Sequence, residues 1–411
     1  MDVEGANREA MARLLSAEPF LEDVRPAIEV VPGMRPNLIL HAGPPIAFDD
    51  MSPLTRGAVI ASALFEGLVR DASQVPVAIK EGKIELGANH DHGCVGSMAG
   101  PTSASRAVYV VRNRKDKNMA QAFVHEGQGE VMAYGAYSRK IIETQRWVAK
   151  VLQPILGQAI RDAGGIDLRA HIAEALLRGD ELHSRNKAAT SLLLERLAVP
   201  LLKSPFPRND VAETVAYLSQ NHMSFATLAM AACKASLDAA AGVPGSTLVT
   251  AYARNGATVG LKVSGLSGKW FTAKAPIIKA HYFPGFSDAD ACPDIGDSVI
   301  TECGGLGQFA VAASPVTAQM LGRTVREANE TMLRMYEITL GEHPVYRIPS
   351  LDFRGSPVGI DAQKVVRTGI LPVCNTSTAN RNPGGGIIGV GVVEMQMECF
   401  RKALSDLYFQ A

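Results

Sequence analysis

A long central segment of this chain, residues 141–242, repeats its apolar positions at helical spacing almost from end to end, and it limits the possible folds more than any other feature. Glycine and proline fall where its helices should break, as at Gly164-Gly165. The helices predicted in this segment are Ile141–Ala163, Leu168–Arg178, Lys187–Leu202, Asp210–Gln220 and Phe225–Ala241. We therefore expect a small helical domain inserted between two parts of different character.

The segment on the N-terminal side mixes short apolar runs with turns, which is typical of mixed α/β structure. Residues 1–30 are predicted to be helical, and a second helix is expected at Ser52–Asp71, where Pro53 suits the first turn. The strands predicted here are Leu38–His41, Val77–Ile79, Ile84–Leu86 and Val108–Val111.

On the C-terminal side, Asn255-Gly256 lies between two β-rich runs, Thr247–Ala253 and Thr258–Val263. This pair predicts a hairpin, because a type I′ turn needs positive φ at both central residues. One helix is expected at Pro315–Leu340. Further strands are predicted at Trp270–Ala273, Val299–Glu302, Val345–Ile348 and Ile387–Val393.

A chain of 411 residues is long enough for two or three domains. The prediction is a mixed α/β (α+β) protein. Its parts are an N-terminal α/β domain at residues 1–140, a helical domain at 141–242 and a C-terminal α/β domain at 243–411.

Charge and cysteine content argue against several classes of protein. The chain has 41 Lys and Arg against 41 Asp and Glu, so no basic excess indicates nucleic acid or a membrane surface. No apolar run approaches the roughly 20 residues of a membrane span, and the first residues lack the apolar core of a signal peptide. The six cysteines form no CxxC pair, which is typical of reduced thiols. We therefore expect a cytoplasmic protein.

The most polar cluster, Asn89-His90-Asp91-His92-Gly93, follows a predicted strand. Two histidines spaced by one residue point to one face of a strand, which suits a shared metal ion or anion. The alternative is one histidine bonded to the backbone and one at the surface. The glycine-rich run after this cluster could direct backbone N–H groups at an anion, and Arg106 could add positive charge.

A second cluster, His183-Ser184-Arg185-Asn186-Lys187, lies at the start of a predicted helix. The N-terminus of a helix attracts anions, so the cluster suits a carboxylate or a phosphate. Simple capping is the alternative. It explains the basic residues less well, because positive charge in the first turn opposes the helix dipole.

A third cluster combines Asp294–Ser298 with Glu302 and the glycine turn 304–307. A strand, a glycine turn and a helix in this order can hold phosphate on backbone amides. Glu302, at the end of the predicted strand, could serve as a general base or bind a substrate amide. The alternative is a tight turn that only permits close packing.

These clusters occur in an order that resembles the YlbE-like (AllG-like) family, over nearly the whole chain. The resemblance rests on Gly87–Gly93, Met98–Gly100, His183–Thr190, Arg254–Gly256, Trp270–Thr272, Pro293–Ser298 and Glu302–Gly307. It implies one subunit of an oxamate carbamoyltransferase, which transfers a carbamoyl group between oxamate, or a related amide, and phosphate in allantoin-type nitrogen catabolism. It also implies two partners, an FdrA-type subunit similar to acyl-CoA synthetases and a third subunit. A homo-oligomer stays open, and no cofactor is expected.

Carbamoyl transfer passes through a tetrahedral oxyanion, so donors must be placed in advance around the reacting groups. On the family's motifs we expect His90, His92 and Glu302 to be catalytic, and we assign no metal ligand. The residues expected to bind the small anionic substrate are Asn89, Asp91, Arg106, His183, Arg185, Asn186, Arg254, Asn255, Asp297, Ser298, Gly304, Gly305 and Gly307.

Two other functions stay open. A metal-dependent amidohydrolase or lyase could use His90, His92 and an acidic residue such as Asp294 or Asp297. A non-catalytic scaffold could complete the sites of its partner subunits. The segment Cys374–Gly386 departs from the family, because it contains no histidine where the family usually has one, and the substrate could differ as a result.

Overall fold

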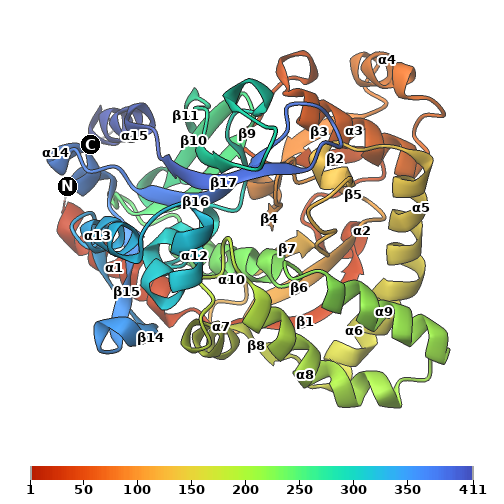
Figure 1. Ribbon diagram of the computed structural model, residues 1–411. Coiled ribbons are helices and arrows are strands. Elements are labelled where there is room, and N and C mark those ends of the chain that lie inside the picture. The colour runs from red at the N-terminus through yellow and green to blue at the C-terminus, as the bar shows by residue number, and fades with distance from the viewer. Residues whose placement is uncertain (1, 410–411) are drawn as a thin grey trace.

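A computed structural model describes residues 2–409, and these residues form a mixed α+β fold, as predicted (Figure 1). The helices are α1 (Val3–Ser16), α2 (Ala27–Val30), α3 (Pro53–Glu66), α4 (Val75–Lys80), α5 (Arg139–Trp147), α6 (Gln153–Asp162), α7 (Leu168–Leu177), α8 (Lys187–Lys203), α9 (Arg208–Gln220), α10 (Ala226–Ala239), α11 (Ile300–Cys303), α12 (Pro315–Met320), α13 (Val325–Met335), α14 (Ala362–Thr368) and α15 (Met397–Phe409). A π-helical turn at Val148–Leu152 joins α5 to α6. None of the helices within residues 2–409 is both long and apolar enough to cross a bilayer.

The strands of the described residues fall into five small sheets. The largest has the order β4 (Cys94–Val95), β7 (Met119–Phe123), β6 (Ala107–Asn113), β1 (Pro19–Pro26) and β8 (Ile166–Asp167). The second has the order β11 (Phe271–Lys274), β10 (Thr258–Val263), β9 (Val249–Asn255) and β13 (Ile295–Gly296). The others are β12 (Lys279–Tyr282), β17 (Ile387–Glu394) and β16 (Val373–Ala379); β14 (Thr339–Ile348) and β15 (Arg354–Ile360); and β3 (Glu85–Ala88), β2 (Leu38–His41) and β5 (Thr102–Ser103).

Helix α10 lies at the middle of the molecule and organises its main core (Figure 1). Eleven of its fourteen residues are buried, including the polar Thr227 and Lys234. A helix that is apolar all round must be covered on every side, and α10 packs against β6 and β7, against α11, and against α1. The prediction that this segment forms a buried helix is confirmed.

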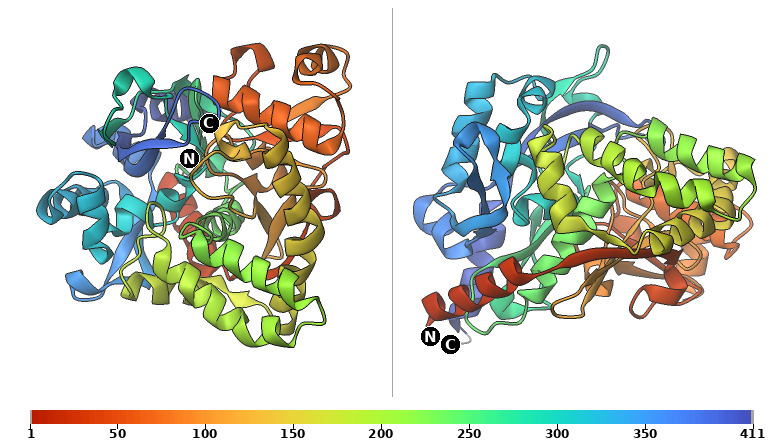
Figure 2. Two further views of the ribbon diagram at one scale, coloured as in Figure 1. Left: turned by 45° about the vertical axis from the view of Figure 1, so that its right-hand side comes forward. Right: turned by 90° about the horizontal axis from the view of Figure 1, so that it is seen from below.

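Helix α1 docks on residues that lie much later in the chain. Its buried Asn7 donates to Thr247 Oγ1 (2.9 Å) across 240 residues of sequence. The side-chain oxygen of Asn7, Oδ1, accepts from Ser246 Oγ (2.9 Å) and from the backbone N–H of Thr247 (2.9 Å). Both views in Figure 2 accordingly show the N-terminal helix close to the C-terminal part of the chain.

The predicted hairpin at Asn255-Gly256 is confirmed, but its turn is not the expected type I′, because of these two residues only Gly256 has positive φ. Strands β9 and β10 pair antiparallel, with Arg254 opposite Val259. Gly256 has φ +81°, a conformation that side chains rarely adopt. The Asn255 side chain accepts from the N–H groups of Ala257 (3.0 Å) and Thr258 (2.7 Å) and thereby closes the turn. The hairpin places Arg254 beside the short strand β13, at the candidate site.

Four secondary-structure predictions are wrong, each because a longer-range contact or an unrecognised signal decides the outcome. Residues 1–30 contain β1, which pairs with β6 along its full length. Val77–Ile79 lies within helix α4, and Val299–Glu302 forms most of the short helix α11, so local β propensity is overridden at both places. The helix expected at Pro315–Leu340 is interrupted near Gly322, and α13 starts again at a capping box of Thr324 and Glu327.

The division into three domains stays a prediction. The helices α5 to α9 follow one another as the sequence predicts, and they lie on one side of the large sheet in Figure 1. The core cluster that contains α10 includes residues from α1, from β9 and from α15.

Candidate functional site

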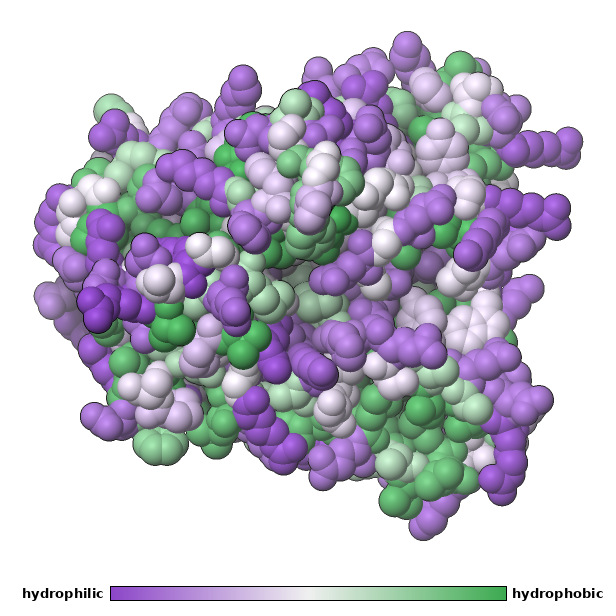
Figure 3. All heavy atoms as spheres, in the orientation of Figure 1, coloured by the Kyte–Doolittle hydropathy of each residue, from purple (hydrophilic) through white to green (hydrophobic). Residues whose placement is uncertain are grey.

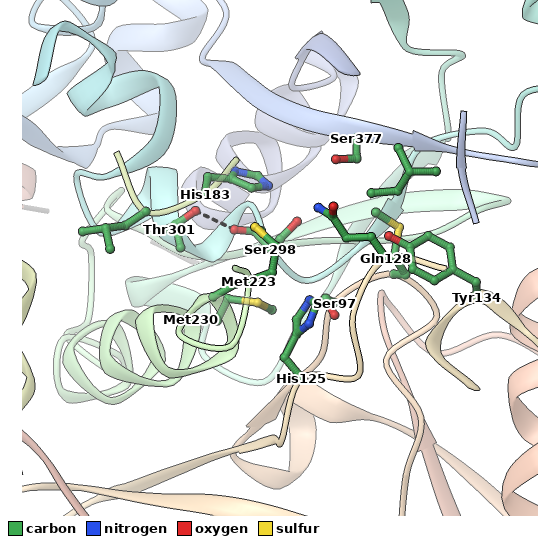
Figure 4. A pocket seen from close by; sticks show the side chains of 14 residues that line it. Ser97, His125, Gln128, Tyr134, His183, Met223, Met230, Ser298, Thr301 and Ser377 are labelled. Carbon is green, nitrogen blue, oxygen red and sulfur yellow. Dashed lines mark hydrogen bonds between the residues drawn. The ribbon is translucent and has the colours of Figure 1, made fainter. Parts of the chain in front are cut away.

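The face of the molecule seen in Figure 3 is hollowed near its middle, and a narrow pocket lies between β16 and β17 on one side and α10 on the other (Figure 4). The loops after β4 and β7, the loop between α7 and α8, and the start of α11 complete its wall. The lining residues are Ser97, Met98, His125, Gln128, Tyr134, Leu182, His183, Met223, Ala226, Met230, Ser298, Thr301, Ser377 and Ile387. Hydroxyl groups and two imidazoles therefore face a partly apolar space.

A histidine and a buried carboxylate form the most distinctive contact at this pocket. His183 Nδ1 lies 2.8 Å from both carboxylate oxygens of Glu302, although the two residues are 119 apart in sequence. Glu302 is fully buried, and His183 is 7% exposed at its side chain. A carboxylate only accepts, so Nδ1 carries the proton, and Nε2 is left as the nitrogen that can exchange one.

The Glu302 carboxylate lies against the end of the glycine turn 304–307. Glu302 Oε1 accepts from the backbone N–H of Gln308 (3.2 Å) and from that of Asn375 (3.1 Å) on β16. Gly307 has φ +61°, and a Cβ there would lie 2.1 Å from Glu302 Oε1. The end of the turn therefore leaves room for this carboxylate and helps to fix its orientation, and the substrate-binding role expected for Gly304, Gly305 and Gly307 stays a prediction.

A second carboxylate, Glu181, lies directly behind His183. Glu181 Oε1 accepts from the backbone N–H groups of Ser184 (2.5 Å) and Arg185 (2.7 Å). Burial is the largest influence on its pKa and raises the pKa of Glu181 to about 7, with nearby Glu302 adding to the rise.

This raised pKa makes the stability of the protein depend on pH. The folded chain keeps the Glu181 proton at pH values where the unfolded chain has lost it, so the stability contribution is present below the ordinary pKa of 4.5 and is lost as the pH rises to about 7. Between these two pH values, Glu181→Gln should reduce the pH dependence of the free energy of unfolding by up to about 1.4 kcal/mol per pH unit. Denaturant unfolding at several pH values tests this, with the exposed Glu195→Gln as control. Equal slopes for the wild type and Glu181→Gln would contradict it.

Arg254 approaches the pocket from behind Ser298. It is fully buried and pairs with Asp294, with 3.2 Å between Nε and Oδ1. Its Nη2 donates to the carbonyl oxygen of Ile295 (3.1 Å) and to Ser298 Oγ (3.3 Å). Burial raises the pKa of Asp294, and the guanidinium opposes that rise. A positive charge therefore lies one hydroxyl group away from the pocket.

Asp297 ties the loops of the N-terminal part to the strand β13. Its carboxylate accepts from the N–H groups of Gly43 (2.8 Å) and Gly96 (2.9 Å) and from Asn89 Nδ2 (3.0 Å). Burial raises the pKa of Asp297 to about 7, and these hydrogen bonds oppose the rise. Asn89 and Asp297 thus position the loop that carries Ser97 and Met98, without lining the pocket themselves.

The histidine pair at residues 90 and 92 lies outside the pocket lining. His90 is buried 3.8 Å from Asp297 Oδ1 and packs edge-on against Trp270, and burial lowers its pKa well below the usual value. His92 Nδ1 contacts the carbonyl oxygen of Pro32 (2.8 Å). Asp91 pairs with Lys262 and accepts from Trp270 Nε1 (3.1 Å). Their catalytic and substrate-binding roles stay predictions.

Other predicted binding residues already have protein partners. Arg106 pairs with buried Glu126 (2.9 Å). Arg185 pairs with buried Asp180, whose second oxygen accepts from the N–H of Ala189 (2.8 Å) in the first turn of α8. An acidic side chain therefore occupies the position where the sequence predicts a bound anion. Asn186 donates to the carbonyl oxygen of His183 (3.1 Å).

Of the predicted residues, the pocket brings together His183 and Ser298 on its wall and Glu302 and Arg254 directly behind them. Gly304 and Gly305 lie in the turn that follows α11. The polar lining residues that the sequence analysis did not predict for the site are His125, Gln128, Tyr134, Thr301, Ser377 and Ser97. One signal pointed to the first two, because His125-Glu126-Gly127-Gln128-Gly129 is a polar, glycine-rich run directly after a strand.

The pocket wall also holds unusual backbone. Met98 (φ +53°) and Leu182 (φ +70°) are two of the few non-glycine residues of the described chain in the left-handed region. Such conformations cost about 1–3 kcal/mol and gather at functional sites. Met98 directly follows the lining residue Ser97, and Leu182 directly precedes the lining residue His183. The unusual backbone conformation therefore helps to orient these two polar side chains.

Within residues 2–409, no group of three or more His, Cys, Asp or Glu side chains is arranged to hold a metal ion.

Comparisons with known proteins agree on one family. A family model described as oxamate carbamoyltransferase subunit AllG matches residues 84–298, which include His183, Arg254 and Ser298. The chain is 41% identical over 402 residues to the uncharacterized protein YahG of Escherichia coli, over 98% of this chain and 85% of YahG. It is 38% identical over 408 residues to the oxamate carbamoyltransferase subunit AllG of Escherichia coli, over 98% and 97% of the two chains. A crystal structure of a conserved protein of unknown function from Enterococcus faecalis V583 matches with a TM-score of 0.97 and 38% identity, over 99% of this chain and 98% of that chain.

Proposed function

The chain belongs to the AllG family of oxamate carbamoyltransferase subunits, and from this membership we propose that its central pocket is a site of carbamoyl transfer. The group would pass between the nitrogen of oxamate, or of a related amide, and phosphate. The observation that carries the proposal is the buried contact between His183 and Glu302 at the wall of this pocket.

The reaction sets clear demands on the site. A phosphate oxygen forms a bond to the carbamoyl carbon, and the bond from that carbon to the amide nitrogen breaks. The departing nitrogen takes up one proton, and negative charge gathers on the carbamoyl oxygen in the transition state. The site must therefore supply a proton near the nitrogen and hydrogen-bond donors near the oxygen.

His183 meets the first demand, which is a proton near the departing nitrogen. Because Glu302 holds its Nδ1–H, the imidazole is fixed in orientation, and Nε2 can accept a proton from the attacking hydrogen phosphate and pass it to the departing nitrogen. In the reverse direction Nε2 takes that proton from the amide nitrogen. Glu302 also stabilises the charged imidazolium in this exchange. The amides of Gln308 and Asn375 keep the carboxylate in place.

Hydroxyl groups and Arg254 meet the second demand, which is hydrogen-bond donors near the carbamoyl oxygen. Ser97, Ser298 and Ser377 line the same pocket as His183 (Figure 4). Arg254 donates to Ser298 Oγ, which strengthens that hydroxyl as a donor toward an anionic oxygen. Ser377 comes from the segment that lacks the family's histidine, so this segment is well placed to alter the choice of substrate.

We further propose that partner subunits complete the activity, since the AllG relative is described as a subunit. An FdrA-type subunit and a third subunit are the partners that the family resemblance implies. The pocket of this chain would then hold the amide, while the partners close it against water.

Phosphorus NMR on the purified chain, alone and co-purified with its partners, tests the proposal. Carbamoyl phosphate should form from carbamoylated oxamate and phosphate, and no product should form without phosphate. The exposed His281→Gln should leave the rate unchanged. Release of ammonia without phosphate, abolished by a chelator, would favour the metal-dependent hydrolase instead.

A further inference from the structure

The second histidine of the pocket, His125, is held in one proton arrangement by its neighbours. Its Nδ1 receives the backbone N–H of Gly127 (3.0 Å) and lies 3.1 Å from Asn221 Nδ2. A backbone N–H can only donate, so Nδ1 must accept. The single proton of the neutral imidazole is therefore on Nε2.

The amide of Asn221 cannot turn around without losing two hydrogen bonds. Its carbonyl oxygen accepts from the N–H of Met223 (3.0 Å), so its NH₂ group must face His125. That NH₂ group also donates to the carbonyl oxygen of His125 (3.0 Å). Asn221 is the C-cap residue of helix α9, and the helix therefore fixes the position of the Asn221 side chain.

Burial keeps this histidine uncharged. His125 is 6% exposed, and burial lowers its pKa to about 4. Near neutral pH it presents an uncharged N–H donor, and Figure 4 shows its ring turned into the pocket opposite His183. His183 is arranged in the reverse sense, because its Nδ1 donates to Glu302 and its Nε2 is free to accept.

We infer that His125 and His183 together recognise one uncharged amide or ureido group, with Asn221 as the positioning residue that, together with the N–H of Gly127, sets the His125 tautomer. The Nε2–H of His125 donates to the carbonyl oxygen, and Nε2 of His183 accepts from the amide N–H. The inference rests on the proposed function and deepens it, since it names the group that the pocket binds and the donor to its oxygen.

A carboxylate in the same position fits poorly. It has no N–H for His183, and its charge faces Glu302 and Glu181 behind that histidine. A site built to bind an N–H group strongly rejects an analogue that lacks it, because its own polar groups are left unpaired. The pocket should therefore separate two molecules of nearly equal shape, oxamate and oxalate.

Nitrogen NMR of histidine-labelled full-length protein tests the tautomer directly. The wild type should show His125 protonated at Nε2, with the signal assigned by its loss in His125→Gln. In Asn221→Asp a carboxylate replaces the NH₂ group and leaves Gly127 as the one remaining donor to Nδ1, so the His125 signal should shift toward forms that carry a proton on Nδ1. Asn209→Asp makes the same change at the exposed opposite end of α9 and should leave the signal unchanged. A wild-type proton on Nδ1, or an unchanged signal in Asn221→Asp, would overturn the inference.

Calorimetric titration with oxamate and oxalate tests the recognised group. Above the pH at which histidine is normally protonated, oxamate should bind at least about 10-fold more tightly. His125→Gln keeps a donor at the Nε2 position and should retain most of the affinity for oxamate, whereas His125→Leu and Asn221→Asp should weaken oxamate binding. Equal binding of the two molecules to the wild type would overturn the inference.

These measurements separate the two proposals. If no carbamoyl phosphate forms with the partners present, but the tautomer and the preference for oxamate hold, the proposed function fails and the inference stands. If carbamoyl phosphate forms while Asn221→Asp keeps the wild-type KM and kcat, the inference fails and the proposed function stands.

Discussion

Glu302→Gln should lower the turnover of the assembled carbamoyltransferase by about 10³–10⁴-fold, because an amide in this position reverses the proton arrangement of His183. The glutamine oxygen can still accept from the amides of Gln308 and Asn375, which leaves its NH₂ group to face Nδ1 of the histidine. Nδ1 must then accept, the proton moves to Nε2, and the imidazole can no longer take a proton from the amide nitrogen.

Initial rates and melting temperatures of the purified complex measure this effect. The variant is nearly isosteric, so its melting temperature should stay near that of the wild type. Glu195→Gln, at an exposed position on α8, serves as the control for loss of one carboxylate. A complex that keeps full turnover with Glu302→Gln would place the reacting groups in the partner subunits and would make this chain a scaffold.

Arg254→Met should destabilise the folded chain by about 3–5 kcal/mol, the cost of leaving one charge of a buried pair without its partner. Both side chains of the Arg254–Asp294 pair are at most 1% exposed, so water cannot replace the guanidinium. Arg254→Met combined with Asp294→Leu removes both charges and should recover most of the loss, since apolar pairs of similar volume can replace a buried ion pair.

Denaturant unfolding at neutral pH checks this result. The exposed pair Arg139–Glu143 offers a matched control, and Arg139→Met should leave the free energy of unfolding nearly unchanged. If the double variant were no more stable than Arg254→Met, the loss would come from packing and from the hydrogen bonds of Arg254 to Ile295 and Ser298.

The extent of sequence-based prediction differs from element to element. Asn255-Gly256 marks its hairpin because Gly256 supplies positive φ and the Asn255 side chain closes the turn on the next two N–H groups, all within a few residues of the chain. The helices at 168–177 and 187–203 are predictable because their apolar residues recur at the spacing that places them on one side of a helix. The run Val299–Glu302 has β-branched residues and is nevertheless helical, and in this conformation the Glu302 carboxylate accepts from the amides of Gln308 and Asn375, which local propensity does not predict.

The candidate site was predicted only in part. His183 and Glu302 were both selected, but the sequence assigned them to separate clusters, since no spacing rule connects residues 119 apart. Arg185 was selected for its place at a helix start, and the partner that neutralises it, Asp180, is five residues earlier in the chain. His125 lies in a polar, glycine-rich run that is a weak signal for a site, and no sequence pattern connects it to Asn221, which lies 96 residues later and helps to set its tautomer.

The docking of α1 on residues 246 and 247 has a consequence for synthesis on the ribosome. Asn7 is made early, but the hydroxyl of Thr247 that it binds is made 240 residues later. The first helix therefore waits, unpaired, while more than half of the chain is translated, and the usual order in which N-terminal parts fold first cannot hold for it. Contacts so far apart in sequence also slow folding, because the intervening loop must be closed before they are formed. Nascent chains halted before residue 247 should accordingly expose α1 to protease, while released full-length chains protect it.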